Sequence, residues 1–444
     1  MFMFLLRKSW YFLVPTKVGI LWTILIGVSI CPFAIGSASA QENSRLDSLI
    51  VLALKNNPQI AMARYESKAA ETRISVARQL PDPELQIAVM NLPTNFSLTS
   101  DGMTMVPQFT LMQLFPWFGK LKAAGQIEHY GYLASNDRLE SSKLDVIANV
   151  KSLYASIYET QKTIELLKYK RELLRSVIKV AEQLFAVGEV PQQDVFRATA
   201  DLTMIESDII KMNSTLTDNY AKLAAIVGVR YMNPFQIDTL QLPNLDSLSR
   251  LQEQAETNNS LLSQIQNVKS AAEAKTIFAR KDAIPDFKVG VSYGFRWALM
   301  PDGTKPYNMM NFELGMTLPI YFAAKQQKMI DEADYMKEAA DEEYGNTLLR
   351  LRSSLRSSYA NAEAQGKLLP LYSKELIPQY EATYNSSLSA YSVGKTTFAM
   401  LIDNLTTLIN AKISLVQIES SYFSAIAQIS TLTGDSLAKY KGVK

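Results

Sequence analysis

The chain has 444 residues, 48% of them hydrophobic, with 45 basic and 43 acidic side chains. This balance provides no basic excess for nucleic-acid binding. A single histidine and a single cysteine exclude a multi-histidine metal site, a His-based triad and a disulfide framework within one chain. We therefore expect no enzymatic activity, no cofactor and no nucleic-acid partner, and a fold stabilised by packing alone.

The N-terminus has the pattern of a secretory signal. Basic residues precede an apolar run at 18–35, which leads into the small residues Ala38-Ser39-Ala40. This order predicts export and cleavage after Ala40, so that residues 1–40 form a signal peptide. An uncleaved membrane anchor is the alternative, because the run and its flanks nearly reach the length that spans a bilayer.

From residue 41 onward the chain repeats one series of landmarks. Each half has two prolines around strand-like stretches, a Val-Gly break in a helical pattern and a closing glycine: Pro81, Pro116, Gly188 and Gly228, then Pro285, Pro319, Gly394 and Gly434. The landmarks recur after about 200 residues, which indicates a duplicated unit. We predict a first repeat at 41–235 and a second at 236–444, each with a helix, two strands and further long helices.

The helical stretches follow a heptad spacing. Alternate steps of four and three residues from Val146 to Phe185 meet apolar side chains everywhere except Thr160 and Arg171, as in a coiled coil. We expect helices at 46–79, 120–186, 194–227, 250–283, 322–391 and 398–433. Pro370 and Pro378 should kink or interrupt the fifth. The longest of these helices would be about 100 Å long, and two shorter helices placed end to end would have the same length. Such lengths suit the wall of a cylinder built from helices.

Four stretches between the prolines have the length and alternation of membrane-spanning strands: 84–92, 109–115, 287–297 and 312–318. We place the two pairs of barrel strands at about 84–115 and about 286–318. Small soluble hairpins are the alternative. Aromatic residues near the strand ends would form the girdle at the membrane interface: Trp117, Phe118, Trp297, Tyr321 and Phe322.

The order and spacing of these features resemble the TolC-like family of outer-membrane efflux proteins. The matching pieces are Asn57-Pro58, Phe115-Pro116-Trp117-Phe118-Gly119, Leu318-Pro319-Ile320-Tyr321-Phe322, the two Val-Gly breaks and the closing glycines. The resemblance covers 41–444 and implies a mainly α-helical chain with membrane β-strands. Three subunits would each contribute four strands to a twelve-stranded barrel, continued by a long periplasmic α-helical coiled-coil barrel. Four strands alone would leave open edges in lipid, which also favours assembly.

The same resemblance implies a passive exit duct in the outer membrane of a Gram-negative-type cell, extending into the periplasm. The partners would be two further copies in a homotrimer, outer-membrane lipid, a periplasmic adaptor (membrane fusion) protein and an inner-membrane pump of the RND or ABC type. The duct would serve a tripartite efflux or type I secretion-like system. The alternative function is a soluble or membrane-anchored periplasmic coiled-coil scaffold or adaptor.

In that family the Val-Gly breaks are helix reversals at the periplasmic tip, where adaptors dock and the tunnel narrows. The resemblance makes these residues docking candidates: Val187, Gly188, Glu189, Val393 and Gly394. The family's second turn often carries a basic residue two positions after the glycine and carboxylates six and nine after it. This chain has Thr396, Met400 and Asp403 there, so only the last position matches.

Two further residues are candidates for the gate, the place where the tunnel narrows at the tip. Lys395 stands one position before the expected basic residue, and Asp194, six after Gly188, keeps the acid in the first repeat. The gate candidates are therefore Asp403, Met400, Thr396, Lys395 and Asp194. A solvated or helix-capping carboxylate is the alternative for Asp403.

Overall fold

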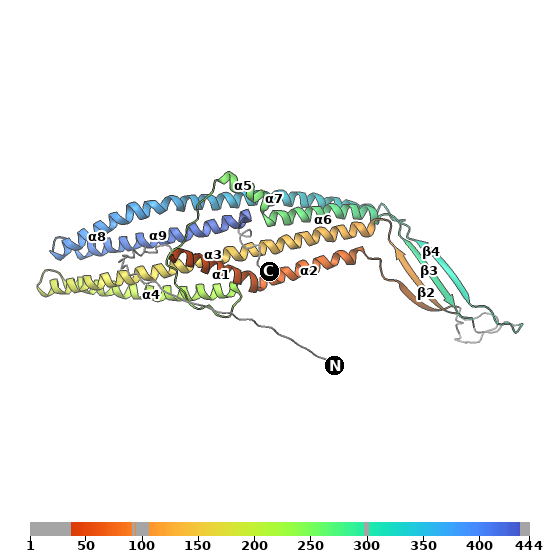
Figure 1. The fold of residues 1–444 in the computed structure, drawn as a ribbon, viewed down its shortest axis with the longest axis horizontal. Coiled ribbons are helices and arrows are strands. Elements are labelled where there is room, and N and C mark those ends of the chain that lie inside the picture. Colours follow the sequence, from red (N-terminus) through yellow and green to blue (C-terminus); the bar gives the residue numbers. More distant parts are fainter. Residues whose placement is uncertain (1–36, 91–93, 95–105, 297–301, 436–444) are drawn as a thin grey trace, which may run out of the picture.

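The computed structural model describes residues 37–90, 94, 106–296 and 302–435, with side chains from residue 45 onward. It is an elongated rod of helices that ends in a four-stranded sheet (Figure 1). The elements in chain order are α1 Ser37–Asn56, α2 Pro58–Arg78, β1 Glu84–Met90, β2 Val106–Phe115, α3 Lys120–Ala186, α4 Gln192–Val227, α5 Leu248–Asn258, α6 Ser260–Asp282, β3 Phe287–Gly294, β4 Met309–Met316, α7 Gln326–Pro370, a π-helical segment Leu371–Leu376, α8 Ile377–Ser392 and α9 Phe398–Thr433.

Helix α3 is the spine of the rod. Its 67 residues extend over about 100 Å at 1.5 Å per residue. Helix α2 packs along the half of α3 nearest the sheet and α4 along the other half, while α6 and α9 also contact α3 (Figure 1). Helix α7 packs against α6 and α9. The two shorter helices α2 and α4, placed end to end, thus extend along the length of the long helix α3, as predicted from the helix lengths.

The heptad positions of α3 form much of the core. Val146, Val150, Ile157 and Leu174 are all almost fully buried, and they pack in two clusters against α4 and its neighbours. Helix α9 supplies Leu401 and other apolar residues to the second cluster. Among the described helices, α9 is the one long and apolar enough to cross a membrane by composition, but it lies within the rod against α3, α7 and α8.

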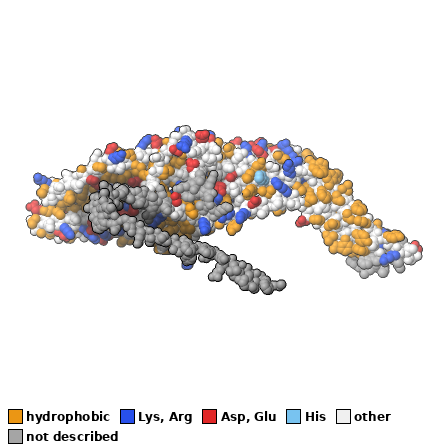
Figure 2. Space-filling view, in the orientation of Figure 1, with side chains coloured by type: hydrophobic (Ala, Val, Ile, Leu, Met, Phe, Trp, Pro, Cys, Tyr) orange, Lys and Arg blue, Asp and Glu red, His pale blue; other side chains and the backbone are white. Residues whose placement is uncertain are grey.

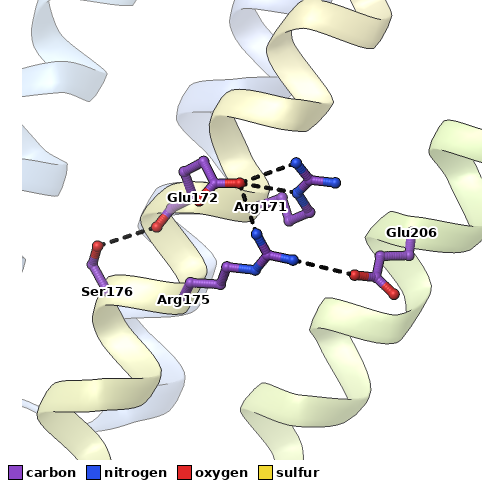
Figure 3. A network of polar contacts seen from close by, with 5 residues as sticks. All are labelled: Arg171, Glu172, Arg175, Ser176 and Glu206. Atoms are coloured by element: carbon purple, nitrogen blue, oxygen red, sulfur yellow. Dashed lines mark hydrogen bonds and ion pairs between the residues drawn. The ribbon is translucent and has the colours of Figure 1, made fainter.

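Arg171, a polar exception on the predicted seam, belongs to a surface network. Its guanidinium lies 3.1 Å from Glu172, which also accepts a hydrogen bond from Arg175 at 3.0 Å (Figure 3). Arg175 reaches Glu206 of α4 at 3.6 Å. Such exposed ion pairs contribute about 0–1 kcal/mol each. Apolar packing, more than this network, therefore holds α3 and α4 together.

Two asparagines divide helices that the sequence analysis predicted as continuous at 46–79 and 250–283. Asn57 separates α1 from α2 and Asn259 separates α5 from α6, each with extended backbone. The side-chain oxygen of each asparagine caps the helix that follows it. The side-chain nitrogen of Asn57 donates a hydrogen bond to the Ile226 carbonyl at 2.7 Å, and that of Asn259 donates one to the Leu432 carbonyl at 2.9 Å. The continuous prediction was wrong because the capped break is more stable than helix at these buried positions.

We expect Asn57→Ala to lower the free energy of unfolding by about 1–3 kcal/mol, because it removes a helix cap and leaves the partly buried Ile226 carbonyl without its donor. Thermal unfolding of the purified protein measures the effect. Asn385→Ala, at an exposed position on α8, is the matched control, with a change of about 0.5 kcal/mol or less. Equal midpoints for the two variants would show that the Asn57 cap does not stabilise the rod.

The predicted helix at 322–391 differs in two places. Residues 320–325 form turns, with the Lys325 N–H bonded to the Tyr321 carbonyl at 2.9 Å, and α7 begins at Gln326. Between Pro370 and Pro378 the helix widens into the π-helical segment, where the Ile377 N–H bonds to the Tyr372 carbonyl. A wider turn accommodates proline, which lacks an N–H and clashes with the preceding turn. The interruption predicted at the two prolines is therefore present, as a π-helical segment.

A segment without regular structure, residues 229–247, lies across the middle of the rod. Phe235 and Ile237 pack there, and their backbone groups bond to the Gln161 side chain at 2.6 and 3.0 Å. Farther along, the Pro243 carbonyl accepts a hydrogen bond from the Tyr422 hydroxyl at 2.8 Å. The segment therefore joins the two halves of the chain at mid-length.

The sheet is antiparallel in the order β1-β2-β3-β4, and its two faces differ in polarity. Cross-strand partners lie on the same face. One rung is entirely apolar, Leu85, Leu111, Val291 and Phe312, and the neighbouring rung on the other face is entirely polar, Gln86, Thr110, Ser292 and Asn311. Leu314, on the apolar face, is 80% exposed, whereas Ser292 is fully buried, so the sheet curls around its polar face.

Strands β1 and β4 are the edges of this sheet, and each pairs with one neighbour only among the described residues. In lipid, each unpaired backbone N–H or C=O costs several kcal/mol. A sheet with an apolar outer face, a polar inner face and two open edges is therefore suited to a barrel closed with other copies.

Candidate functional site

The two Val-Gly reversals lie together at the end of the rod opposite the sheet (Figure 1). Gly188 and Gly394 have φ of 78° and 71°, in the left-handed region. The residue after each glycine bonds back to a carbonyl five residues earlier: Glu189 to Leu184 at 2.9 Å and Lys395 to Ala390 at 2.8 Å. This Schellman arrangement ends a helix and favours glycine for its backbone conformation.

The five docking candidates all lie on the surface of these two turns. Val187 and Val393 are 72% and 64% exposed, and Glu189 is also exposed. A Cβ added to either turn glycine would meet nothing within 4 Å. The tip therefore presents apolar side chains on two backbone reversals that have open space around them.

We expect Gly394→Val to distort the tip, because a β-branched residue in the left-handed conformation is strained by roughly 1–2 kcal/mol or more. The resemblance to outer-membrane efflux proteins then predicts that trimers persist while efflux falls, as measured by substrate accumulation in cells. Gly345→Val is the matched control, since Gly345 lies in α7 with ordinary φ and nothing within 4 Å of an added Cβ. Loss of trimers in the tip variant, with normal transport by any that remain, would contradict the assignment.

Inside the tip, Tyr391 joins the two reversals. Its ring is almost fully buried and packs edge-on against Phe398 at 6.0 Å. Burial raises the pKa of the Tyr391 hydroxyl, and the negative charge of Asp194 acts in the same direction. The hydroxyl has no hydrogen-bond partner among the described residues. The structure thus brings Asp194 of α4 to the end of α8, and the sequence analysis missed Tyr391, three residues before Gly394.

Asp403 lies in a different setting from Asp194. It lines a groove of about 310 Å³ between α3, α4 and α9, together with Lys170, Arg197, Asp201 and Asp208. Burial lowers the pKa of the Lys170 ammonium, against the opposing charges of Asp201 and Asp208. Asp403 therefore faces mixed charge rather than a second acidic residue on α9.

The sequence analysis did not identify the other charged residues of this groove. Asp201 and Asp208 are seven residues apart and share one face of α4, which is the signal that was available. Lys170 belongs to a distant part of the sequence, so its approach depends on the packing of three helices.

The remaining gate candidates lie closer to the reversal. Met400 is 58% exposed, and its backbone N–H is capped by the Thr397 hydroxyl at 3.3 Å. Lys395 is exposed and Thr396 is half-buried within the turn itself. The first two turns of α9 and the reversal before them thus carry four of the five candidates, and Asp194 lies on α4.

At the other end of the rod, aromatic residues mark the junction with the sheet. Trp117 stacks on Phe287 at 5.6 Å, while Phe118, Tyr321 and Phe322 are exposed. Trp297, also predicted for this girdle, lies outside the described residues.

A partly buried ion-pair cluster fixes the same junction. Asp286 accepts hydrogen bonds from the Trp117 backbone N–H and the Lys120 ammonium, both at 2.8 Å. Burial opposes the charge of Lys120, but its hydrogen bonds to Asp282 and Asp286 outweigh this and raise the pKa of Lys120. The start of α3 is thereby tied to the start of β3.

The sequence and fold are similar to those of known outer-membrane proteins. The outer membrane protein TolC of Salmonella enteritidis is 22% identical over 419 residues, which cover 90% of this chain and 83% of TolC. The cobalt-zinc-cadmium resistance protein CzcC of Cupriavidus metallidurans is 20% identical over 391 residues, 88% of this chain and 90% of CzcC. The solved outer-membrane channel OprN has the same fold, with a TM-score of 0.76 at 16% identity over 89% of this chain and 92% of OprN.

The family profile described as outer membrane efflux protein matches two successive stretches, residues 49–229 and 251–435. These stretches include the helices of the rod, the strands of the sheet and both reversals at the tip. Because the match extends over most of the sequence, the chain belongs to the outer membrane efflux protein family.

Proposed function

We propose that this efflux protein is one subunit of a homotrimeric duct through which substrates leave the periplasm passively. The observation that carries the proposal is the sheet: apolar on its exposed face, polar on its curved inner face, and open at both edges. Three such sheets, paired edge to edge, would satisfy every edge group and enclose a polar passage. The rival function, a soluble or anchored coiled-coil scaffold, gives no reason for such a sheet.

The helical tip would couple the duct to the rest of an export system. Its exposed valines and glycine reversals provide a surface for a periplasmic adaptor, and Asp403, Met400, Thr396, Lys395 and Asp194 would line or control the narrow end of the passage. Energy would come from an inner-membrane pump of the RND or ABC type. The relatives TolC and CzcC support a role in efflux.

We also propose that the two halves derive from one duplicated unit, with the boundary near residues 235 and 236. Asn57 and Asn259 cap equivalent helices and bond to the ends of α4 and α9. Tyr220 and Tyr422 each donate a hydrogen bond to a carbonyl of the middle segment. Corresponding contacts of this kind support descent from one unit.

The mature protein is expected to begin at Gln41, because the cleavage pattern ends at Ala40. Intact-mass measurement of the purified protein should match residues 41–444, with the small loss expected if the N-terminal glutamine cyclises. A mass that includes Met1 would contradict cleavage and support the anchored alternative.

The test of the proposed function is accumulation of a fluorescent efflux substrate in cells that lack this chain. Reintroducing the chain should lower accumulation only when the inner-membrane pump is active, and the chain should fractionate with the outer membrane. Unchanged accumulation, with the chain in the buffer-soluble periplasmic fraction, would favour the scaffold.

A further inference from the structure

A groove of about 400 Å³ lies between α3 and α6, at the end of the rod nearest the sheet. Lys122, Gln126 and Tyr130 line it from α3, and Ser270, Ile277 and Lys281 from α6. None of these residues belongs to the tip or to the polar face of the sheet. The groove is therefore a separate feature, with one lysine from each helix near the sheet.

The cationic end is made by Lys122 and Lys281, neither of which forms an ion pair within the part of the chain that the structure describes. Lys281 lies over the start of α3, since a Cβ added to Gly119 would be 3.1 Å from its ammonium. Lys120, by contrast, is already bound by Asp282 and Asp286. Two lysines thus line this end of the groove without an ion-pair partner among the described residues.

The carboxylate of Glu273 also lines the groove, but at its other end. Glu273 precedes Lys281 by eight residues, which places it about 12 Å away along α6. At that distance, with solvent between them, it does not neutralise the lysines. Near Gly119, Lys120, Lys122 and Lys281 outnumber the carboxylates of Asp282 and Asp286 by three to two, so this end of the groove keeps a net positive charge.

With the proposed barrel in the outer membrane, this end lies at the membrane border. Gly119 directly follows Trp117 and the 84% exposed Phe118, at the exit from β2. Figure 2 shows basic side chains over this end of the rod, next to the hydrophobic surface of the sheet. Polar headgroups extend roughly 5–7 Å beyond the hydrocarbon, and Lys122 lies within about 5 Å of Gly119 along α3. The two lysines are therefore at the depth of lipid phosphates.

We propose that this groove binds the headgroup of an anionic phospholipid from the periplasm-facing leaflet of the outer membrane. The ammonium groups of Lys122 and Lys281 contact the phosphate, which supplies an ion-pair partner that neither has within the described part of the chain. The Gln126 side chain, one helical turn beyond Lys122, provides a hydrogen bond to the polar group beyond the phosphate. A bound lipid would tie α3 to α6 directly below the barrel. The inference depends on the outer-membrane location and not on which substrate the duct carries.

The test is native mass spectrometry of the purified full-length trimer in detergent, with phosphatidylglycerol or phosphatidylethanolamine added at equal concentration. We expect the trimer to bind phosphatidylglycerol in preference to phosphatidylethanolamine. Combining Lys122→Gln with Lys281→Gln should weaken the binding of phosphatidylglycerol about 30-fold, which is the loss expected for two lysines near a lipid surface. Lys275→Gln with Lys374→Gln is the matched control. Lys275 on α6 and Lys374 in the π-helical segment are both exposed, neither lines the groove, and the change in charge is the same.

Three results would overturn the proposal: equal binding of the two lipids, equal binding by the groove variant and its control, or displacement of phosphatidylglycerol by millimolar inorganic phosphate alone. The last would identify a site for a free anion rather than a lipid. If the double variant does not form trimers, the single variants carry the test, each with an expected loss of about fivefold. Lipid binding is measured on the isolated trimer and efflux is measured in cells. A failure of the lipid-binding proposal can therefore be distinguished from a failure of the proposed efflux function.

Discussion

Leu314→Arg in β4 is expected to abolish outer-membrane trimers. Leu314 is 80% exposed on the apolar face of the sheet, where a barrel would contact lipid. An arginine on the lipid face of such a barrel costs up to about 2–4 kcal/mol, depending on its depth, and each of three subunits would bear that cost. Heat-modifiable migration of the outer-membrane fraction on a denaturing gel measures the loss of trimer.

Asn311→Arg is the matched control in the same strand. Asn311 lies on the opposite face, where its side chain donates a hydrogen bond to Ser292 at 3.1 Å. An arginine there would face the water-filled passage, so trimers should form while cation permeation falls. Trimers in the Leu314 variant and none in the Asn311 variant would show that the two faces have been assigned in reverse.

Asp403→Asn is expected to reduce the cation preference of the duct severalfold, together with any block by multivalent cations. Asp403 follows Gly394 by nine residues, so it lies about 13 Å from the reversal along α9. Three-fold symmetry would bring three copies around one axis and concentrate negative potential at a constriction. Single-channel recording in planar bilayers measures the permeability ratio and the block.

The control for this variant is Asp218→Asn, which removes the same charge from an exposed pair with Lys222 on α4. It should leave selectivity unchanged. Unchanged selectivity in the Asp403 variant would show that its carboxylate serves the mixed-charge groove with Lys170 and Arg197 and does not face the passage. Lys395, Thr396 and Met400 would then be the residues to test.

The sequence predicted the long elements well, and the reason is physical. The heptad seam and flanking glycines gave 120–186 and 398–433, the bounds that α3 and α9 have in the structure. Alternation between prolines located all four strands, although the strand ends differ by a few residues. The fold class and the family predicted from these patterns are confirmed.

Other features depend on partners that are distant in sequence. Apolar spacing continues across Asn57 and Asn259. Pro58 is a local signal for the first break, but the bonds to Ile226 and Leu432 that hold both asparagines depend on distant residues. The middle segment has no periodicity and is placed by Gln161. The groove around Asp403 requires three helices to meet, and the approach of Asp194 to Tyr391 requires two reversals to pack together. No local pattern encodes such contacts.

Electron cryomicroscopy of the detergent-extracted outer-membrane protein tests the trimeric duct most directly. We predict a particle with three-fold symmetry in which four strands from each subunit close a twelve-stranded barrel, continued by a helical tunnel with the Val187-Gly188 and Val393-Gly394 reversals at its far end. A monomeric particle with unpaired β1 and β4 edges, or a helical assembly without a closed barrel, would contradict it.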